Sequence, residues 1–229
     1  MAKVAFSALV SDLRNKVGGN VFTKVRSGPM VRIKVSPTQP RSAAQTAVRS
    51  NFSSLAKSWS TITQAQRNGW IALAASLPQK DVFGNTYFMT GLQLYEQCNR
   101  NLNSIGVATI SVAPATLAVG APGALTLVAT AGVPTFTVDA ATEPAAGEVP
   151  LIFATKPISP GRIFVGGNRQ IIDSAIAAAT AGPWNIQALY AAKYGALVAG
   201  QNLNVGVRYI DNTTGAGSGL SVGQIFCAA

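Results

Sequence analysis

Eleven lysines and arginines lie between Leu13 and Lys80, and this window contains no aspartate or glutamate. Basic side chains at this density bind phosphate or carboxylate groups through charge-assisted contacts that weaken as salt is added. The first chemistry that the sequence offers is therefore the binding of a polyanion or of an acidic protein surface. The eleven residues are Arg14, Lys16, Lys24, Arg26, Arg32, Lys34, Arg41, Arg49, Lys57, Arg67 and Lys80.

The charge is distributed unevenly along the chain. Residues 1–105 hold thirteen lysines and arginines against three acids, whereas residues 106–229 hold five of each. The whole formal net charge of +10 therefore lies in the first half. Such an asymmetry predicts an acidic or polyanionic partner for the N-terminal half alone.

The sequence offers little for catalysis. It contains no histidine, which excludes histidine-dependent triads and histidine-bearing zinc sites. Asp139, Glu143 and Glu148 form the only local cluster of acids, and their spacing does not match a calcium loop. The string from Gly166 to Arg169 lacks the spacing of a phosphate-binding loop and is interpreted as a hairpin turn. We expect no enzymatic activity, no cofactor and no metal.

The cations of residues 20–35 are positioned by a predicted hairpin of two strands, Val21–Arg26 and Met30–Val35, joined across residues 27–29. Apolar and basic residues alternate in both strands, a period of two that predicts one apolar face and one cationic face. Solvated charges that prevent edge-to-edge aggregation would give the same pattern. The cations expected to share the cationic face are Lys24, Arg26, Arg32 and Lys34.

Three helices are predicted after the extended connector that ends at Pro40. The first, about residues 41–59, carries one apolar stripe of Ala44, Val48, Phe52, Leu55 and Trp59. It also adds two cations, so the residues expected to bind a polyanion or partner protein are Lys24, Arg26, Arg32, Lys34, Arg41 and Arg49.

Capping boxes predict where the other two helices begin. Thr63 and Gln66 precede a helix with Trp70, and Thr90 and Gln93 precede a helix whose stripe includes Cys98. Trp59, Trp70 and Cys98 are expected in a small core rather than at a binding site.

From about Gly106 the sequence changes to short β-rich runs separated by glycine, proline and asparagine. The alternation over residues 202–209 is typical of a half-buried strand. This half predicts a β-sandwich of the immunoglobulin or fibronectin type III kind. The predicted class is thus α+β: a basic hairpin and three short helices in residues 1–105, then a sandwich in residues 106–229. Strands are expected at residues 124–130, 135–138, 151–155, 162–165, 201–211 and 220–226.

A second set of signals is a series of short motifs. The string Pro37-Thr38-Gln39-Pro40-Arg41-Ser42 is followed by Gln45, Arg49, Phe52 and Trp59, then by residues 62–67 with Trp70, and by Thr90-Gly91. This pattern resembles that of a group of poorly characterised phage and prophage proteins, with Ile62 in place of their usual leucine. Residues 154–162 and Thr213-Thr214-Gly215 are similar to their second half. The resemblance implies a phage origin and assigns no catalytic residue.

Charge and resemblance together predict a structural component of a tailed-phage virion. The predicted place is the head, as a decoration or minor capsid protein present in multiple copies. Its basic half would bind an acidic capsid or connector surface, and a tail or connector component is a close variant. The alternative is a sequence-independent DNA-binding protein. Neither a signal peptide nor a membrane span is expected, so we predict synthesis in the host cytoplasm and a final location in the virion.

Overall fold

A computed structural model describes residues 2–5, 12–35, 41–162, 168–174 and 176–229 of the chain. The chain folds as two compact units, one made of Met1–Glu96 with Ser111–Ala113 and the other of Gln97–Ile110 with Pro114–Ala229. The sequence placed a domain boundary after residue 105. The division between the compact units falls inside helix α3 (Gly91–Ser104), and the predicted domains of residues 1–105 and 106–229 stay a prediction.

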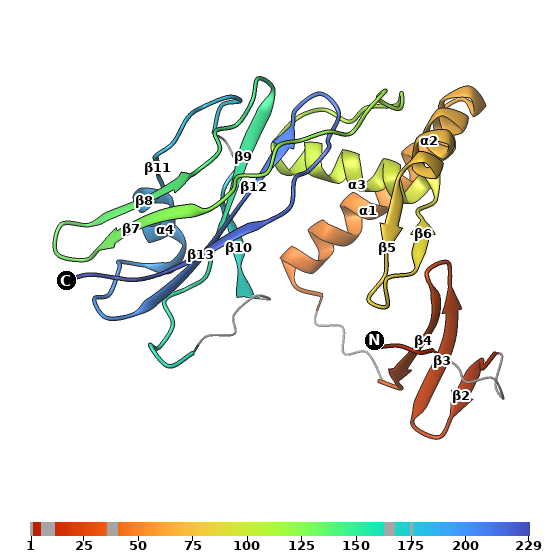
Figure 1. Cartoon of the computed structure of the whole chain (residues 1–229), viewed down its shortest axis with the longest axis horizontal. Coiled ribbons are helices and arrows are strands. Elements are labelled where there is room, and N and C mark those ends of the chain that lie inside the picture. The colour runs from red at the N-terminus through yellow and green to blue at the C-terminus, as the bar shows by residue number, and fades with distance from the viewer. Residues whose placement is uncertain (1, 6–11, 36–40, 163–167, 175) are drawn as a thin grey trace. The chain divides into compact units, whose positions relative to one another are not determined.

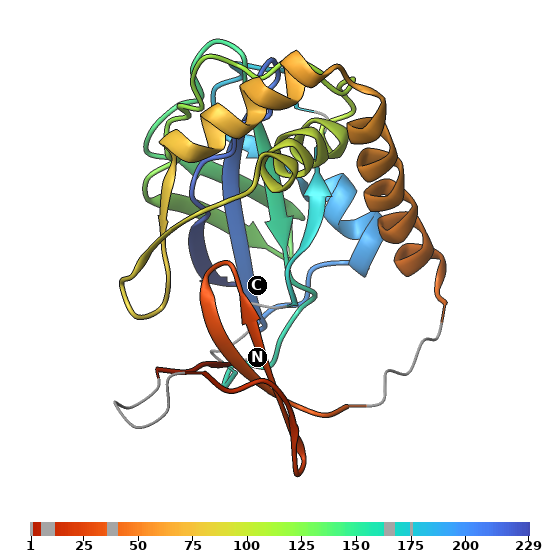
Figure 2. The same ribbon diagram turned by 90° about the vertical axis from the view of Figure 1, so that its right-hand side faces the viewer.

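Unit 1 begins with a four-stranded antiparallel sheet in the order β1-β4-β3-β2 (Figure 1, red). The predicted hairpin is confirmed as β3 (Asn20–Val25) and β4 (Gly28–Ile33), a twisted pair that Figure 2 shows from the side. Two further strands, β1 (Ala2–Lys3) and β2 (Asn15–Val17), flank it. Gly18 and Gly19 form the tight β2–β3 loop, where Gly18 has a φ of +58° that glycine adopts readily.

The register of the β3–β4 hairpin differs from the predicted register because its loop contains two residues instead of the predicted three. Arg26 and Ser27 form a two-residue loop, so Val25 lies opposite Gly28 and Val21 opposite Arg32. Directly opposed residues share a face, and a change of one residue in the loop exchanges the faces of one strand relative to the other. Lys24 and Arg32 therefore lie on opposite faces, and the predicted single cationic face is wrong. Alternation within each strand cannot show which faces of two strands match.

Three helices follow, as predicted: α1 (Ala43–Thr61), α2 (Gln64–Ser76) and α3. The Thr63 hydroxyl accepts the Gln66 N–H at 3.3 Å, and the Gln66 side chain accepts the Thr63 N–H at 2.8 Å. Thr90 and Gln93 make the same exchange at 3.2 and 2.8 Å. Both predicted capping boxes are confirmed. The hairpin β5 (Pro78–Lys80) and β6 (Thr86–Phe88) between α2 and α3 was not predicted, because its strands are too short to show a period.

The core of unit 1 is built around Trp70. Its indole N–H donates to the Ser111 carbonyl oxygen at 2.9 Å, and its ring meets Tyr95 edge to face at 5.5 Å between centroids. The Trp59 ring also lies against Tyr95, tilted, with 5.3 Å between the ring centroids. The predicted core role is confirmed for fully buried Trp70, whereas Trp59 is only half-buried. The α1 stripe is only partly buried, since Leu55 is buried while the earlier members of the stripe are exposed.

Unit 2 contains two antiparallel sheets that face each other across one core, in the orders β10-β9-β12-β13 and β11-β8-β7 (Figure 1). Fully buried Phe136, Ile152, Val205 and Tyr190 join the sheets to helix α4 (Gln187–Tyr194). The α+β class is confirmed. The strands are β7 (Leu125–Thr130), β8 (Thr135–Ala140), β9 (Glu148–Ala154), β10 (Gln170–Asp173), β11 (Trp184–Asn185), β12 (Asn202–Asp211) and β13 (Ser221–Phe226).

Five of the seven strands described in unit 2 agree with predicted segments, whereas β10, β11 and α4 were not predicted. Most of the segment predicted at residues 162–165 lies outside the described residues. The half-buried character predicted for β12 is wrong, because Asn202 and Asn204 on its polar face are also buried. Helix α3 reaches this face, where Arg208 donates to the Asn101 side chain. None of the described helices is long and apolar enough to cross a membrane.

Removal of the α2 cap should lower the stability of unit 1. Thr63→Ala deletes the hydroxyl that accepts the Gln66 N–H, and such a loss costs about 0.5–2 kcal/mol of unfolding free energy. Urea denaturation followed by tryptophan fluorescence measures this change. Thr63→Ser keeps the hydroxyl and should unfold close to the wild type. Equal destabilisation by both substitutions would show that the cap does not stabilise α2.

A methyl group at Gly215 should destabilise unit 2. Gly215 has a φ of +71°, and an added Cβ would overlap the carbonyl oxygen of Cys98 in α3. We expect Gly215→Ala to cost about 2 kcal/mol or more. Gly219→Ala is the matched control, because an added Cβ there meets no atom within 4 Å. Similar denaturation midpoints for the two variants would contradict the close contact between α3 and the β12–β13 connection.

Candidate functional site

The six cations predicted to bind a partner are all exposed. Lys24 and Arg32 lie in the β1–β4 sheet, Arg26 lies in the β3–β4 loop, and Lys34 follows β4 directly. The structure thus brings four of them together in one sheet but not onto one face. The other two lie elsewhere in unit 1: Arg41 precedes α1, and Arg49 lies in its first half.

One face of the β1–β4 sheet, here called the Phe22 face, is mainly apolar. The register places Val17, Asn20 and Ile33 in one row across the strands, and Asn15, Phe22 and Val31 in the next. Ile33 is 71% exposed and Val17 56%, while Phe22 and Val31 are half-buried. Lys24 lies on this face beside its apolar residues. The face could form an apolar contact with a cation at its side.

The opposite face, here called the Val21 face, carries more charge. Lys16, Val21 and Arg32 form one row across β2, β3 and β4, with Val21 buried between two exposed cations. Lys3 of β1 lies opposite Met30 and belongs to the same face. Lys16 and Arg32 are available for phosphate or carboxylate groups.

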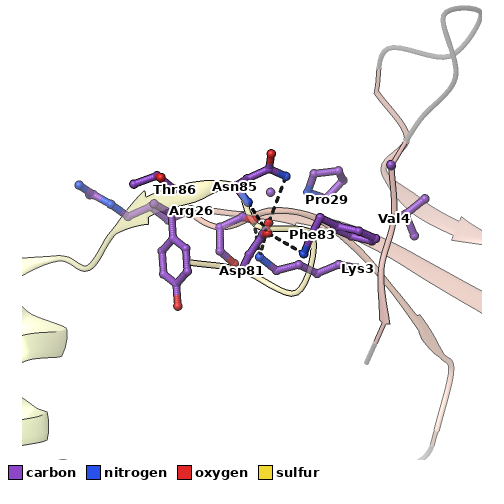
Figure 3. A pocket seen from close by; sticks show the side chains of 12 residues that line it. Lys3, Val4, Arg26, Pro29, Asp81, Phe83, Asn85 and Thr86 are labelled. Atoms are coloured by element: carbon purple, nitrogen blue, oxygen red, sulfur yellow. Dashed lines mark hydrogen bonds and ion pairs between the residues drawn. The ribbon is translucent and has the colours of Figure 1, made fainter. Parts of the chain in front are cut away.

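Lys3 connects this sheet to the β5–β6 hairpin. Its ammonium group donates to the Asp81 carboxylate at 2.9 Å and to the Ser27 carbonyl at 2.7 Å, and it lies 5.2 Å from the centroid of the Tyr87 ring (Figure 3). The Asp81 side chain is only 4% exposed and also accepts the N–H groups of Phe83 and Asn85, each at 2.8 Å. These hydrogen bonds, with Lys3 first, hold the pKa of Asp81 below its usual value of 3.8.

A pocket of about 350 Å³ surrounds this ion pair (Figure 3). Val4, Pro29 and the exposed ring of Phe83 supply apolar surface, and Arg26 supplies a guanidinium group. The pocket could accept a partner's side chain through apolar contact and charge. Sequence reasoning missed it because Lys3 and Asp81 are 78 positions apart. The one local signal was Asp81 itself, four residues before Asn85 in a glycine-containing turn.

Two acids of unit 2, Glu143 and Glu148, accept hydrogen bonds from backbone N–H groups. The Glu148 carboxylate accepts the N–H groups of Gly120 at 2.8 Å and Ala145 at 2.9 Å, and Glu143 accepts the Gly182 N–H at 3.0 Å. Among the described residues, no group of three potential ligands is placed to hold a metal ion. Gly166 and Gly167, interpreted as part of a turn, lie outside the described residues.

Comparison of the chain with protein-family models, with curated proteins and with solved structures found no match. The predicted resemblance to phage and prophage proteins stays a prediction.

Acid should release β1 from the sheet. Because the pKa of Asp81 is lower in the folded chain than in the unfolded chain, its stabilisation is complete at pH values above about 3.8 and is lost as pH falls through the folded pKa. Hydrogen exchange at the Val4 amide, which donates to the Pro29 carbonyl at 3.1 Å, reports this release once the intrinsic exchange rate is divided out.

Asp81→Asn is the control for this experiment. The amide can still accept backbone N–H groups but cannot form an ion pair with Lys3. The variant should show weaker protection of Val4 at pH 7 and little further change in acid. Wild-type protection that stays constant down to pH 2, well below the usual carboxyl range, would contradict a role for this ion pair.

Proposed function

We propose that the chain is a structural component of a tailed-phage virion, docked on other virion proteins through its basic N-terminal half. The proposed place is the head, as a decoration or minor capsid protein in multiple copies. The observation that carries this proposal is the β1–β4 sheet, which exposes apolar residues on one face and cations on both. A sheet normally buries one face against another element. This sheet therefore gains stability when a partner covers it.

Charge supports an acidic partner. Asp12 pairs with Arg14 at 2.9 Å and Asp81 with Lys3 at 2.9 Å, so these two carboxylates are already occupied. Among the described residues, the other exposed cations between residues 13 and 80 form no ion pair and are left to interact with water or with another molecule. A capsid or connector surface rich in aspartate and glutamate meets this requirement.

The proposal includes a fibronectin type III-like or immunoglobulin-like sandwich for unit 2. The strand order supports it. If β7 to β13 are lettered A, B, C, C′, E, F and G, one sheet reads A-B-E and the other C′-C-F-G. Sandwiches of this kind pair B with E, and place F between C and G. Helix α4 between β11 and β12 is an addition to that plan.

Two other functions follow from specific observations. The exposed cations alone would suit a tail or connector protein of the virion as well as they suit a head protein. The row of Lys16, Val21 and Arg32 favours sequence-independent DNA binding, because it presents two cations on one face. The proposal includes no catalytic activity and no cofactor. It places synthesis in the host cytoplasm and the mature protein in the particle.

Mass spectrometry of purified particles tests the proposal. We expect peptides of this chain at several copies per particle, with attachment of the purified protein slowed as sodium chloride is raised from about 0.1 to about 1 M, where screening shortens from about 10 to about 3 Å. Absence of the chain from purified particles would rule the proposal out. Retention of the purified protein on duplex DNA, with log affinity falling linearly with log salt, would favour the DNA-binding alternative.

A further inference from the structure

We infer that the β1–β4 sheet docks through its Phe22 face, and that the occupant of this face is a protein surface with an apolar centre and an acidic surround. This inference rests on the proposed function and makes its partner specific. It assigns the contact to one face of one sheet. The charge pattern alone did not distinguish a protein partner from DNA.

The apolar residues of this face are neighbours in space. Val31 and Phe22 are directly opposed, and Ile33 lies two residues along β4 from Val31 on the same face. Val17 of β2 lies in the same row as Ile33, with Asn20 of β3 between them. Adjacent strands lie about 4.8 Å apart, so the side chains form one patch rather than scattered exposed residues. Covering such a patch is worth roughly 25 cal/mol for each Å² removed from water.

The composition of this face favours a protein over a nucleic acid. Phosphates are bound by cations and polar groups, and apolar side chains gain nothing from them. The pair that suits phosphates, Lys16 and Arg32, lies on the Val21 face. The Phe22 face instead is mainly apolar, with Asn20 between Val17 and Ile33 and with Asn15 and Lys24 beside Phe22, a mixed composition typical of a protein interface.

Charge argues against a second copy of the chain as the occupant. Residues 12–35 carry six cations and one acid, and that acid, Asp12, pairs with Arg14. Two copies packed through their Phe22 faces would place two Lys24 side chains in one interface and bring two positively charged sheets together, and like charges across an interface are unfavourable. An acidic surround on a different protein turns the same charges into favourable contacts.

Two matched substitutions test the assignment. Ile33→Asp and Val25→Asp add the same charge to the same sheet at exposed positions, 71% and 43%, but on opposite faces. Each is made in the full chain, checked for wild-type circular dichroism and denaturation, and counted in purified particles. We expect Ile33→Asp to lower particle occupancy about tenfold or more, and Val25→Asp to leave it within about twofold of wild type. Equal occupancy of the two variants would overturn the assignment.

A photocrosslinking residue placed at position 33, and separately at position 25, identifies the occupant without any change of charge. We expect adducts from position 33 to an acidic segment of another virion protein, and few from position 25. Adducts from position 33 to DNA or to a second copy of this chain would overturn the inference. Wild-type protein missing from particles would refute the proposed function itself, whereas wild-type protein present with crosslinks equal at both positions would refute only the choice of face.

Discussion

The two-residue loop of Arg26 and Ser27 determines which side chains share each face of the N-terminal sheet. Side chains alternate along a strand with a period of two, so one residue more in that loop would move Arg32 beside Lys24 and Val31 beside Val21. The loop that forms instead places Val31 beside Phe22, and β2 adds Val17 to their face and Lys16 to the other. The separation of an apolar face from a more cationic face is thus a consequence of backbone geometry, built from residues that no single strand brings together.

The Lys3–Asp81 ion pair is the second constraint on unit 1. It connects the shortest strand of the sheet to the β5–β6 hairpin, and Asp81 also closes that hairpin by accepting two backbone N–H groups. The pair is nearly dry, with 13% of the Lys3 side chain and 4% of the Asp81 side chain exposed. A pair removed from water in this way must have its remaining polar atoms satisfied, and the Ser27 carbonyl and the Tyr87 ring do so for Lys3. One of the few acids of the N-terminal half is therefore used inside the fold, while the cations around it stay at the surface.

Features set by a few adjacent residues could be predicted from the sequence, and features set by distant contacts could not. Thr63 with Gln66, and Thr90 with Gln93, specify helix starts because a hydroxyl and an amide three residues apart satisfy the first free N–H groups. The strands β7, β8, β12 and β13 were predicted from their composition and flanking turns. The buried polar face of β12 was not, because its partners are distant in the chain: Asn101 of α3 accepts from Arg208, and Arg169 donates to Asn204. The pocket at Lys3 could not be predicted either, because Lys3 and Asp81 are 78 positions apart in the chain. The cations of the candidate site were identified from the sequence, but their assignment to faces depended on a register that alternation cannot supply.

The two faces of the sheet would contribute differently to the proposed docking. An exposed ion pair contributes about 0–1 kcal/mol, so even several contacts by Lys24 or Arg26 would hold a partner weakly. Full burial of a large aliphatic side chain contributes about 1.5–3 kcal/mol, so Ile33, Val31 and Phe22 would supply most of the affinity. Long-range attraction between a basic sheet and an acidic surface would instead raise the association rate and exclude basic partners. Salt should then slow attachment more than it speeds release. This division explains why one small sheet carries both an apolar patch and a surplus of cations, a combination that neither DNA binding nor simple solubility requires.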